Sequence, residues 1–168
     1  MRSTWAPKTE RALHRYASGH LRYEIYVLLE QAQKLEELGE IEDAMGDALL
    51  EASLVHLRLL DDFLGSPQQA QPPTRDDPDD VFARHWLPGW APRRFLTGGQ
   101  RQRINAQLAH LSARRRWRVG WNVPALTTAC CQGFVRFLDQ LNVAHPRRAR
   151  AFAESRARIE AWLARHTP

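Results

Sequence analysis

The stretch LRYEIYVLLEQAQKL, residues 21–35, decides the fold class. Its apolar residues recur at spacings of three and four, which is typical of the buried face of an amphipathic helix. Ser18 precedes the stretch as a candidate N-cap, and Gly39 follows it as a natural stop. We therefore predict a helix from Gly19 to Leu38.

The same periodicity returns along the rest of the chain, with no competing strand pattern. Asn122 is a candidate cap for a helix that carries Pro124 at its second position. Trp86 and Trp90 follow a short predicted helix and are expected to close the end of the bundle, with base stacking as the alternative. The sequence thus predicts an all-α protein, an antiparallel four-helix-type bundle with a short extra helix and a C-terminal helix. Its further helices are expected at residues 40–64, 79–86, 99–116, 122–141 and 145–165.

We expect one helical domain over residues 1–168. Residues 1–16 are interpreted as a tail or a short helix, residues 17–142 as the bundle and residues 143–168 as a basic C-terminal helix. The Pro-rich segment 65–80 is interpreted as a mobile loop within the domain, because too little chain precedes it to stand alone.

Composition limits the cellular setting. No apolar run approaches the ~20 residues that cross a bilayer, and no secretory signal pattern follows the N-terminus. The two cysteines, Cys130 and Cys131, are adjacent in a helical pattern, so neither a disulfide nor a metal site is expected. We expect a cytoplasmic protein that does not associate with membranes and needs no cofactor.

Charge is distributed unevenly along the chain. Residues 1–90 have nine basic and sixteen acidic residues, whereas residues 91–168 have fifteen arginines, no lysine and three acids. This asymmetry favours a polyanionic partner for the second half, or docking between oppositely charged halves or subunits. Arginine also suits phosphate, because its guanidinium group can bond two oxygens at once.

The predicted helix 99–116 carries a stripe of polar and basic residues beside its apolar face. Arg103 and His110 are seven residues apart and share one side of the helix, with Gln107 between them. A cation beside a group that passes protons at neutral pH is the minimum needed to cleave a phosphodiester. The alternative is a solvated or interface face. The helix ends in a basic cluster that suits a phosphate backbone or is simply a solvated helix end, made of Arg114, Arg115, Arg116 and Arg118.

A second polar pair is predicted inside the bundle. His56 lies on the apolar face of the second predicted helix, and Glu24 lies at the edge of the apolar face of the first. A buried histidine needs a hydrogen-bond partner. We therefore expect a buried Glu24–His56 pair, or else a functional His56 that opens on a cleft.

A bundle of this size with Arg103 and His110 on its third long helix resembles the HEPN superfamily, in an uncharacterised bacterial branch. The family motif is an arginine, usually followed directly by a polar residue, then four to six intervening residues and a histidine. Here six residues intervene, and Asn105 stands one place later than the family's polar residue. The resemblance covers roughly residues 18–142 and is mainly architectural.

The resemblance implies a metal-independent ribonuclease, with Arg103, Asn105 and His110 as its catalytic residues at the cleft of a homodimer. Many members of this family are toxins of toxin–antitoxin systems or phage-defence effectors, so RNA and an antitoxin are the implied partners. The alternatives are a non-catalytic HEPN-like module that binds RNA or protein, and a structural helical adaptor.

Overall fold

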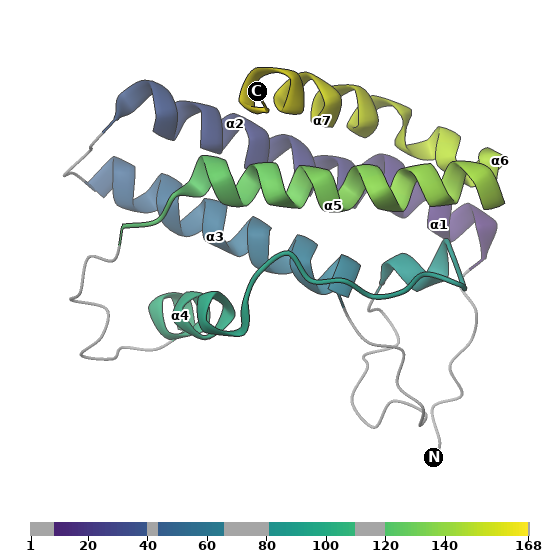
Figure 1. Cartoon of the computed structure of the whole chain (residues 1–168), viewed down its shortest axis with the longest axis horizontal. Helices are drawn as coiled ribbons and strands as arrows, with labels where there is room; N and C mark the ends of the chain where they lie inside the picture. The colour runs from purple at the N-terminus through teal and green to yellow at the C-terminus, as the bar shows by residue number, and fades with distance from the viewer. Residues whose placement is uncertain (1–8, 40–43, 66–80, 110–119, 168) are drawn as a thin grey trace, which may run out of the picture.

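The computed structural model describes residues 9–39, 44–65, 81–109 and 120–167, and every regular element in these ranges is helical. This confirms the predicted all-α bundle (Figure 1). The elements are α1 Glu10–Tyr16, the π-helical turn η1 Ala17–Leu21, α2 Arg22–Leu38, α3 Ala44–Gly65, the 3-10 turn η2 Ala83–His85, α4 Gly98–Ala109, α5 Val123–Ala144, α6 Pro146–Ala149, the 3-10 turn η4 Arg150–Phe152 and α7 Ala153–His166.

The first helix begins earlier than its sequence predicts. Thr9 is the N-cap, with its hydroxyl accepting a hydrogen bond from the backbone N–H of Ala12 at 3.2 Å. From there α1, η1 and α2 follow without a break, so residues 10–16 form the short helix that was the alternative to a tail. Ser18 lies inside the π-helical turn and donates its hydroxyl hydrogen to the carbonyl of His14 at 2.9 Å. A serine bonded back in this way sits within a helix instead of capping it.

Three other predicted boundaries change. The short helix expected at residues 79–86 is a 3-10 turn, Ala83–His85, in its described part. The helix that Asn122 caps continues to Ala144, three residues beyond the predicted end. The last helix is divided by a 3-10 turn between α6 and α7, and Phe152 at the end of this turn lies in the core at 1% exposure.

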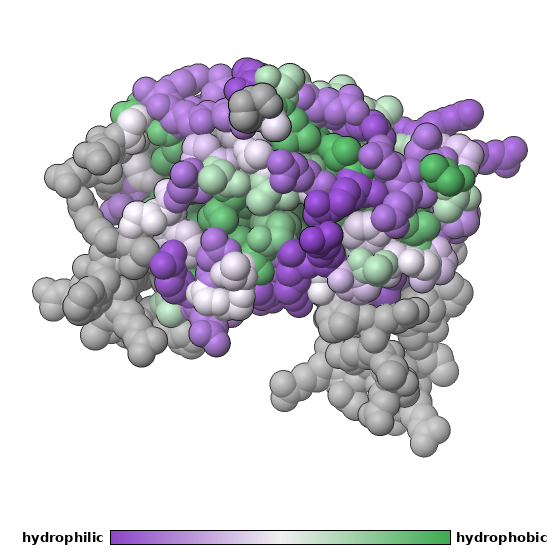
Figure 2. All heavy atoms as spheres, viewed as in Figure 1, coloured by the Kyte–Doolittle hydropathy of each residue, from purple (hydrophilic) through white to green (hydrophobic). Residues whose placement is uncertain are grey.

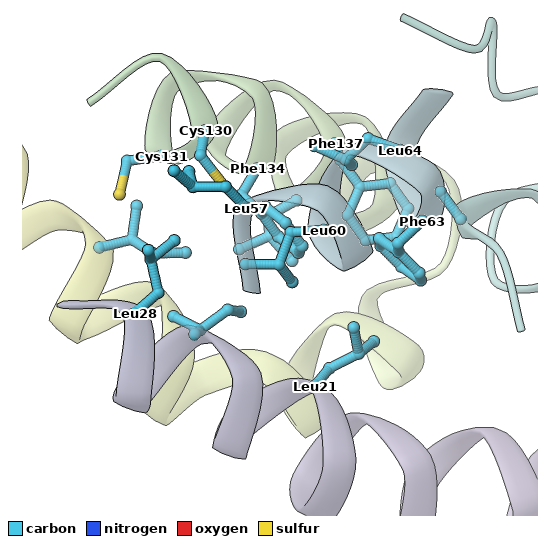
Figure 3. Close-up of a cluster of buried hydrophobic side chains, with 14 of the residues drawn as sticks. Leu21, Leu28, Leu57, Leu60, Phe63, Leu64, Cys130, Cys131, Phe134 and Phe137 are labelled. Atoms are coloured by element: carbon cyan, nitrogen blue, oxygen red, sulfur yellow. The ribbon is translucent and has the colours of Figure 1, made fainter. Parts of the chain in front are cut away.

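Large aromatic side chains fill the middle of the bundle. The ring of Phe63 on α3 lies 5.5 Å from that of Phe134 and 5.6 Å from that of Phe137 on α5. Trp86 packs edge-on against Phe63, with ring centroids 5.5 Å apart. Trp86 and Trp90 are both buried, as expected for side chains that close the bundle end. Figure 3 shows the α5 side chains facing those of α2 and α3 across this cluster.

The long helices form two sides with different surroundings. α5 packs on α3 and α7, and α2 packs on α3 (Figure 1). α7 covers α2 and α5 on one side, whereas α4 lies on the opposite side, beyond α3. Within the part of the chain that the structure describes, no helix is long and apolar enough to cross a membrane.

An ion pair joins α1 to α6. Arg148 donates hydrogen bonds to both carboxylate oxygens of Glu10, and its Nη1 donates to the carbonyl of Trp86 at 2.7 Å. These hydrogen bonds hold the pKa of the Glu10 carboxyl below its usual value. The N-terminal turns are therefore fixed to α6 and to the bundle end.

Candidate nucleic-acid interface on α4

The structure places two of the expected site residues on one exposed helix. Arg103 and Asn105 both lie on α4 with exposed side chains. Gln107 lies on the same helix, but the structure does not describe its side chain. His110 lies outside the described residues, and so does the basic cluster Arg114, Arg115, Arg116 and Arg118. The structure therefore describes the first part of the predicted polar stripe.

The start of α4 is fixed by a reciprocal pair of hydrogen bonds. The hydroxyl of Thr97 accepts from the backbone N–H of Gln100 at 3.2 Å, and the side chain of Gln100 accepts from the N–H of Thr97 at 2.8 Å. This is a capping box, which satisfies two N–H groups that a helix start would leave free. Ile104, fully buried, anchors the same helix on the core.

Asp61 connects α3 to the segment that leads into α4. Its side chain is fully buried, and Oδ1 accepts hydrogen bonds from the backbone N–H groups of Phe95 and Leu96 at 2.9 and 3.0 Å. Oδ2 accepts from Arg94 at 2.9 Å and from Arg101. A buried carboxylate with four donors is satisfied, so this residue fixes the approach to α4.

Asp62 and Arg58, also on α3, take part in the same group of ion pairs. Asp62 accepts from Arg94 at 3.0 Å and from Arg101 at 2.8 Å, and it pairs with Arg58 one turn earlier. We call Arg58, Asp61, Asp62, Arg94 and Arg101 the Asp61 cluster. It contains three cations and two anions. The pKa of Arg58 is lowered because the side chain is partly desolvated and because Arg101 and Arg94 lie close to it.

The Asp61 cluster also orients an expected site residue. Nε of Arg58 donates to the side-chain oxygen of Asn105 at 3.2 Å. The Asn105 amide therefore presents its NH₂ group away from Arg58, toward solvent. No local pattern predicts this contact, since 47 residues separate Arg58 from Asn105.

Arg103 stacks on an aromatic ring at the start of α5. Its guanidinium carbon lies 4.4 Å from the ring centroid of Trp121, which is a cation–π geometry. Among the described residues, Arg103 has no carboxylate partner. We call Arg103 and Trp121 the α4 surface, which presents a positively charged group fixed by stacking. Asn105 projects about 200° from Arg103 around the helix, so it lies on the other flank of α4.

The space-filling view shows what borders this region. On the face dominated by α5, hydrophobic surface is exposed over the junction of α3 and α5, and hydrophilic groups flank it (Figure 2). The region beside α4 thus presents apolar and charged groups together, as many macromolecular interfaces do.

Glu24 and His56 are brought together, but away from α4. Nδ1 of His56 lies 2.5 Å from Oε2 of Glu24, and because a carboxylate only accepts, Nδ1 is the donor. Their side chains are 12% and 23% exposed, so the expected burial is incomplete. Tyr23 covers the pair edge-on, with ring centroids 6.1 Å apart. His56 faces α2 whereas Arg58 faces α4, so the pair and the α4 surface are separate sites.

Comparisons with known proteins assign this chain to no family. No family model, curated protein or solved structure matches this chain.

Asp61 is the residue that sequence analysis missed. It lies four positions after the buried Leu57 and three before the buried Leu64, so helical spacing already places it on the buried face of α3. A carboxylate on a buried face needs donors, and several arginines follow in the next helical segment. In the described parts of the chain, no three histidine, cysteine, aspartate or glutamate side chains come together in a group that could hold a metal ion.

Proposed function

We propose that this chain binds RNA at the α4 surface and cleaves it there without a metal ion. The observation that supports the proposal is the Arg103 guanidinium, which is exposed, stacked on Trp121 and unpaired with any acid among the described residues. A stacked guanidinium keeps its N–H edge directed outward, and that edge matches two oxygens of a phosphate.

Preorganisation is the second support. α4 is fixed by its capping box, by Ile104 and by the Asp61 cluster. A helix that is already fixed loses little conformational entropy when it binds, and its charges need little reorganisation when charge develops on the substrate. Asp61 is accordingly a positioning residue in this proposal.

The chemistry follows from the substrate. RNA carries its own nucleophile, the ribose 2′-OH, next to the scissile phosphate. In the proposal Arg103 stabilises the charge that grows on the phosphoryl oxygens, and His110 transfers the proton to or from a ribose oxygen. The products are a 2′,3′-cyclic phosphate and a 5′-OH. The role of His110 rests on its place in the sequence and on the HEPN resemblance, as do a homodimeric cleft and a toxin or defence role.

The alternative is binding without cleavage. An HEPN-like module that binds RNA would use the same arginine stack, and it would not require His110. One experiment separates the two functions, because binding and cleavage can be measured on the same RNA.

The test is cleavage of end-labelled RNA in EDTA by the full chain and by His110→Ala, Arg103→Ala and Arg136→Ala. Arg136 is an exposed arginine on α5, so its variant loses the same charge outside the α4 surface. We expect His110→Ala and Arg103→Ala to lower the cleavage rate by about 100-fold or more, and Arg136→Ala to change it little. Equal losses in all three variants would indicate nonspecific charge effects. RNA binding without cleavage by the unaltered chain would support the alternative, and neither binding nor cleavage would overturn both.

A further inference from the structure

A pocket of about 270 Å³ lies between the start of α2 and the first turns of α7. α7 and α4 lie on opposite sides of the bundle, so this pocket is remote from the α4 surface (Figure 1). Its size is near the lower limit for small-molecule sites, which suits a single small ligand. The residues that line it are Gly19, Arg22, Tyr23, Tyr26, Glu154 and Arg158.

The walls combine aromatic rings with cations. Tyr23 and Tyr26 are 59% and 40% exposed, although large aromatic side chains are usually more buried. The guanidinium carbon of Arg158 lies 4.5 Å from the ring centroid of Tyr26. Arg158 has no acidic partner within the described ranges, whereas Nη1 of Arg22 pairs with Glu154 at 2.8 Å.

The backbone at one wall is unusual. Gly19 lies in the π-helical turn Ala17–Leu21, and such turns are rare and frequent at functional sites. A Cβ atom built on Gly19 would have nothing within 4 Å, so the pocket extends to the backbone there. The glycine and the wider turn together leave open the space that a side chain would otherwise occupy.

We propose that this pocket binds one nucleotide, with the base stacked on Tyr23 and the phosphate bound by Arg158. Exposed tyrosine faces bind planar rings of any base, and an arginine that lacks an acidic partner and is oriented by stacking binds phosphate. Glu154 can accept hydrogen bonds from ring N–H or amino groups, which a purely cationic pocket could not do. The ligand is either a free nucleotide or one residue of an RNA strand, since both present the same base and phosphate.

The test is calorimetric titration of the full chain with a nucleoside 5′-monophosphate, a short single-stranded RNA, the unphosphorylated nucleoside and inorganic phosphate. Arg158→Ala and Tyr23→Ala remove the two proposed contacts. We expect each to weaken nucleotide binding at least fivefold, given the usual effect of losing one stacked aromatic side chain. Arg147→Ala is the matched control, because it removes an exposed arginine of α6 outside the pocket.

A second variant fills the pocket and keeps every polar group. Gly19→Leu places a side chain in the open space and replaces glycine with a better helix former. We expect it to fold with an unchanged or higher melting temperature by circular dichroism and to lose at least 90% of nucleotide binding. Nucleotide binding at the unaltered level in a folded Gly19→Leu protein would overturn the proposal.

The ligands in this titration distinguish a free nucleotide from one residue of an RNA strand. Binding of the monophosphate, sensitive to Arg158→Ala, supports a free nucleotide. Binding of RNA alone, with the same sensitivity, supports one residue of a strand. The proposal is overturned if inorganic phosphate or the nucleoside binds as tightly as the nucleotide, if no ligand binds, or if Arg147→Ala weakens binding as much as Arg158→Ala. Nucleotide binding at the pocket and RNA cleavage at the α4 surface are tested by different variants. Failure of the cleavage test with Arg103→Ala therefore does not affect the pocket proposal.

Discussion

The carboxylate of Asp61 accepts a hydrogen bond from the backbone N–H of Leu96 at 3.0 Å, across 35 residues of sequence. The same oxygen accepts from the neighbouring N–H of Phe95 at 2.9 Å. One side chain thus replaces the backbone partners that this irregular segment lacks. Asp61 thereby joins α3 to the segment that leads into α4, the helix of Arg103.

Asp61→Ala is expected to destabilise the protein by about 3 kcal/mol, because it leaves two backbone N–H groups without their acceptor and leaves Arg94 and Arg101 with Asp62 alone. Urea unfolding followed by circular dichroism measures the loss. Asp62→Ala is the control: its side chain is 33% exposed, so we expect a cost of about 1 kcal/mol or less. Equal costs for the two variants would show that Asp61 has no special role.

Gly65→Ala is expected to destabilise the protein by about 1–3 kcal/mol, although alanine is normally the better helix former. A Cβ atom at Gly65 would lie 2.3 Å from Cγ and 3.1 Å from the backbone Cα of Arg94. Gly98→Ala, at the start of α4, meets nothing within 4 Å and should be neutral or stabilise by about 0.4–1 kcal/mol. Thermal melts should show a lower melting temperature for Gly65→Ala and an unchanged or higher one for Gly98→Ala. A higher melting temperature for Gly65→Ala would show that Arg94 can move away from the new Cβ atom.

The thiols are expected to resist modification while the protein is folded. Burial raises the pKa of Cys131 to about 12, and it raises that of Cys130 well above its usual value. A thiol-specific disulfide reagent at pH 8 should therefore react slowly with the native chain and rapidly in concentrated guanidinium chloride, because the thiolate is the nucleophile.

The same shift sets a pH dependence. The folded pKa of Cys131 is raised above its unfolded value, so the contribution of this group to stability is fully present below about pH 8.5 and is lost as pH rises toward about 12. Urea midpoints at alkaline pH, compared with those of Cys131→Ala, measure it. Native thiols that react at the unfolded rate, or identical alkaline profiles for the two proteins, would contradict this account.

Local signals in the sequence predicted much of the helical framework. Asn122 caps α5 as expected, with its side chain accepting from the N–H of Ala125 at 3.0 Å. The capping box of α4 is equally local, because Thr97 and Gln100 are only three residues apart. Trp86 and Trp90 are buried at the bundle end. In each case the determining contact spans a few residues or follows from apolar periodicity alone.

The candidate site was less predictable, because its contacts join distant segments. Asn105 was selected by its place after Arg103, but its partner is Arg58, on another helix. Trp121 follows Arg103 by 18 positions, and no local pattern in the sequence predicts that its ring packs against the Arg103 guanidinium. The helix start at Ser18 was wrong for a similar reason: Ser18 and Gly19 have the composition of a boundary, and burial of Leu13 and Ala17 overrides it.

The π-helical turn lets the first helix accommodate one additional residue without losing the register of its buried face. Leu13, Ala17, Leu21 and Ile25 are all buried although each step is four residues, which in a regular α-helix would drift around the axis by about 40° a step. The wider turn compensates for that drift. Deleting one residue from it would leave Leu13 and Leu21 seven positions apart, which is close to two regular turns, so a regular α-helix would keep both on the core. The first helix therefore holds one residue more than regular α-helical turns need to keep its buried face in register.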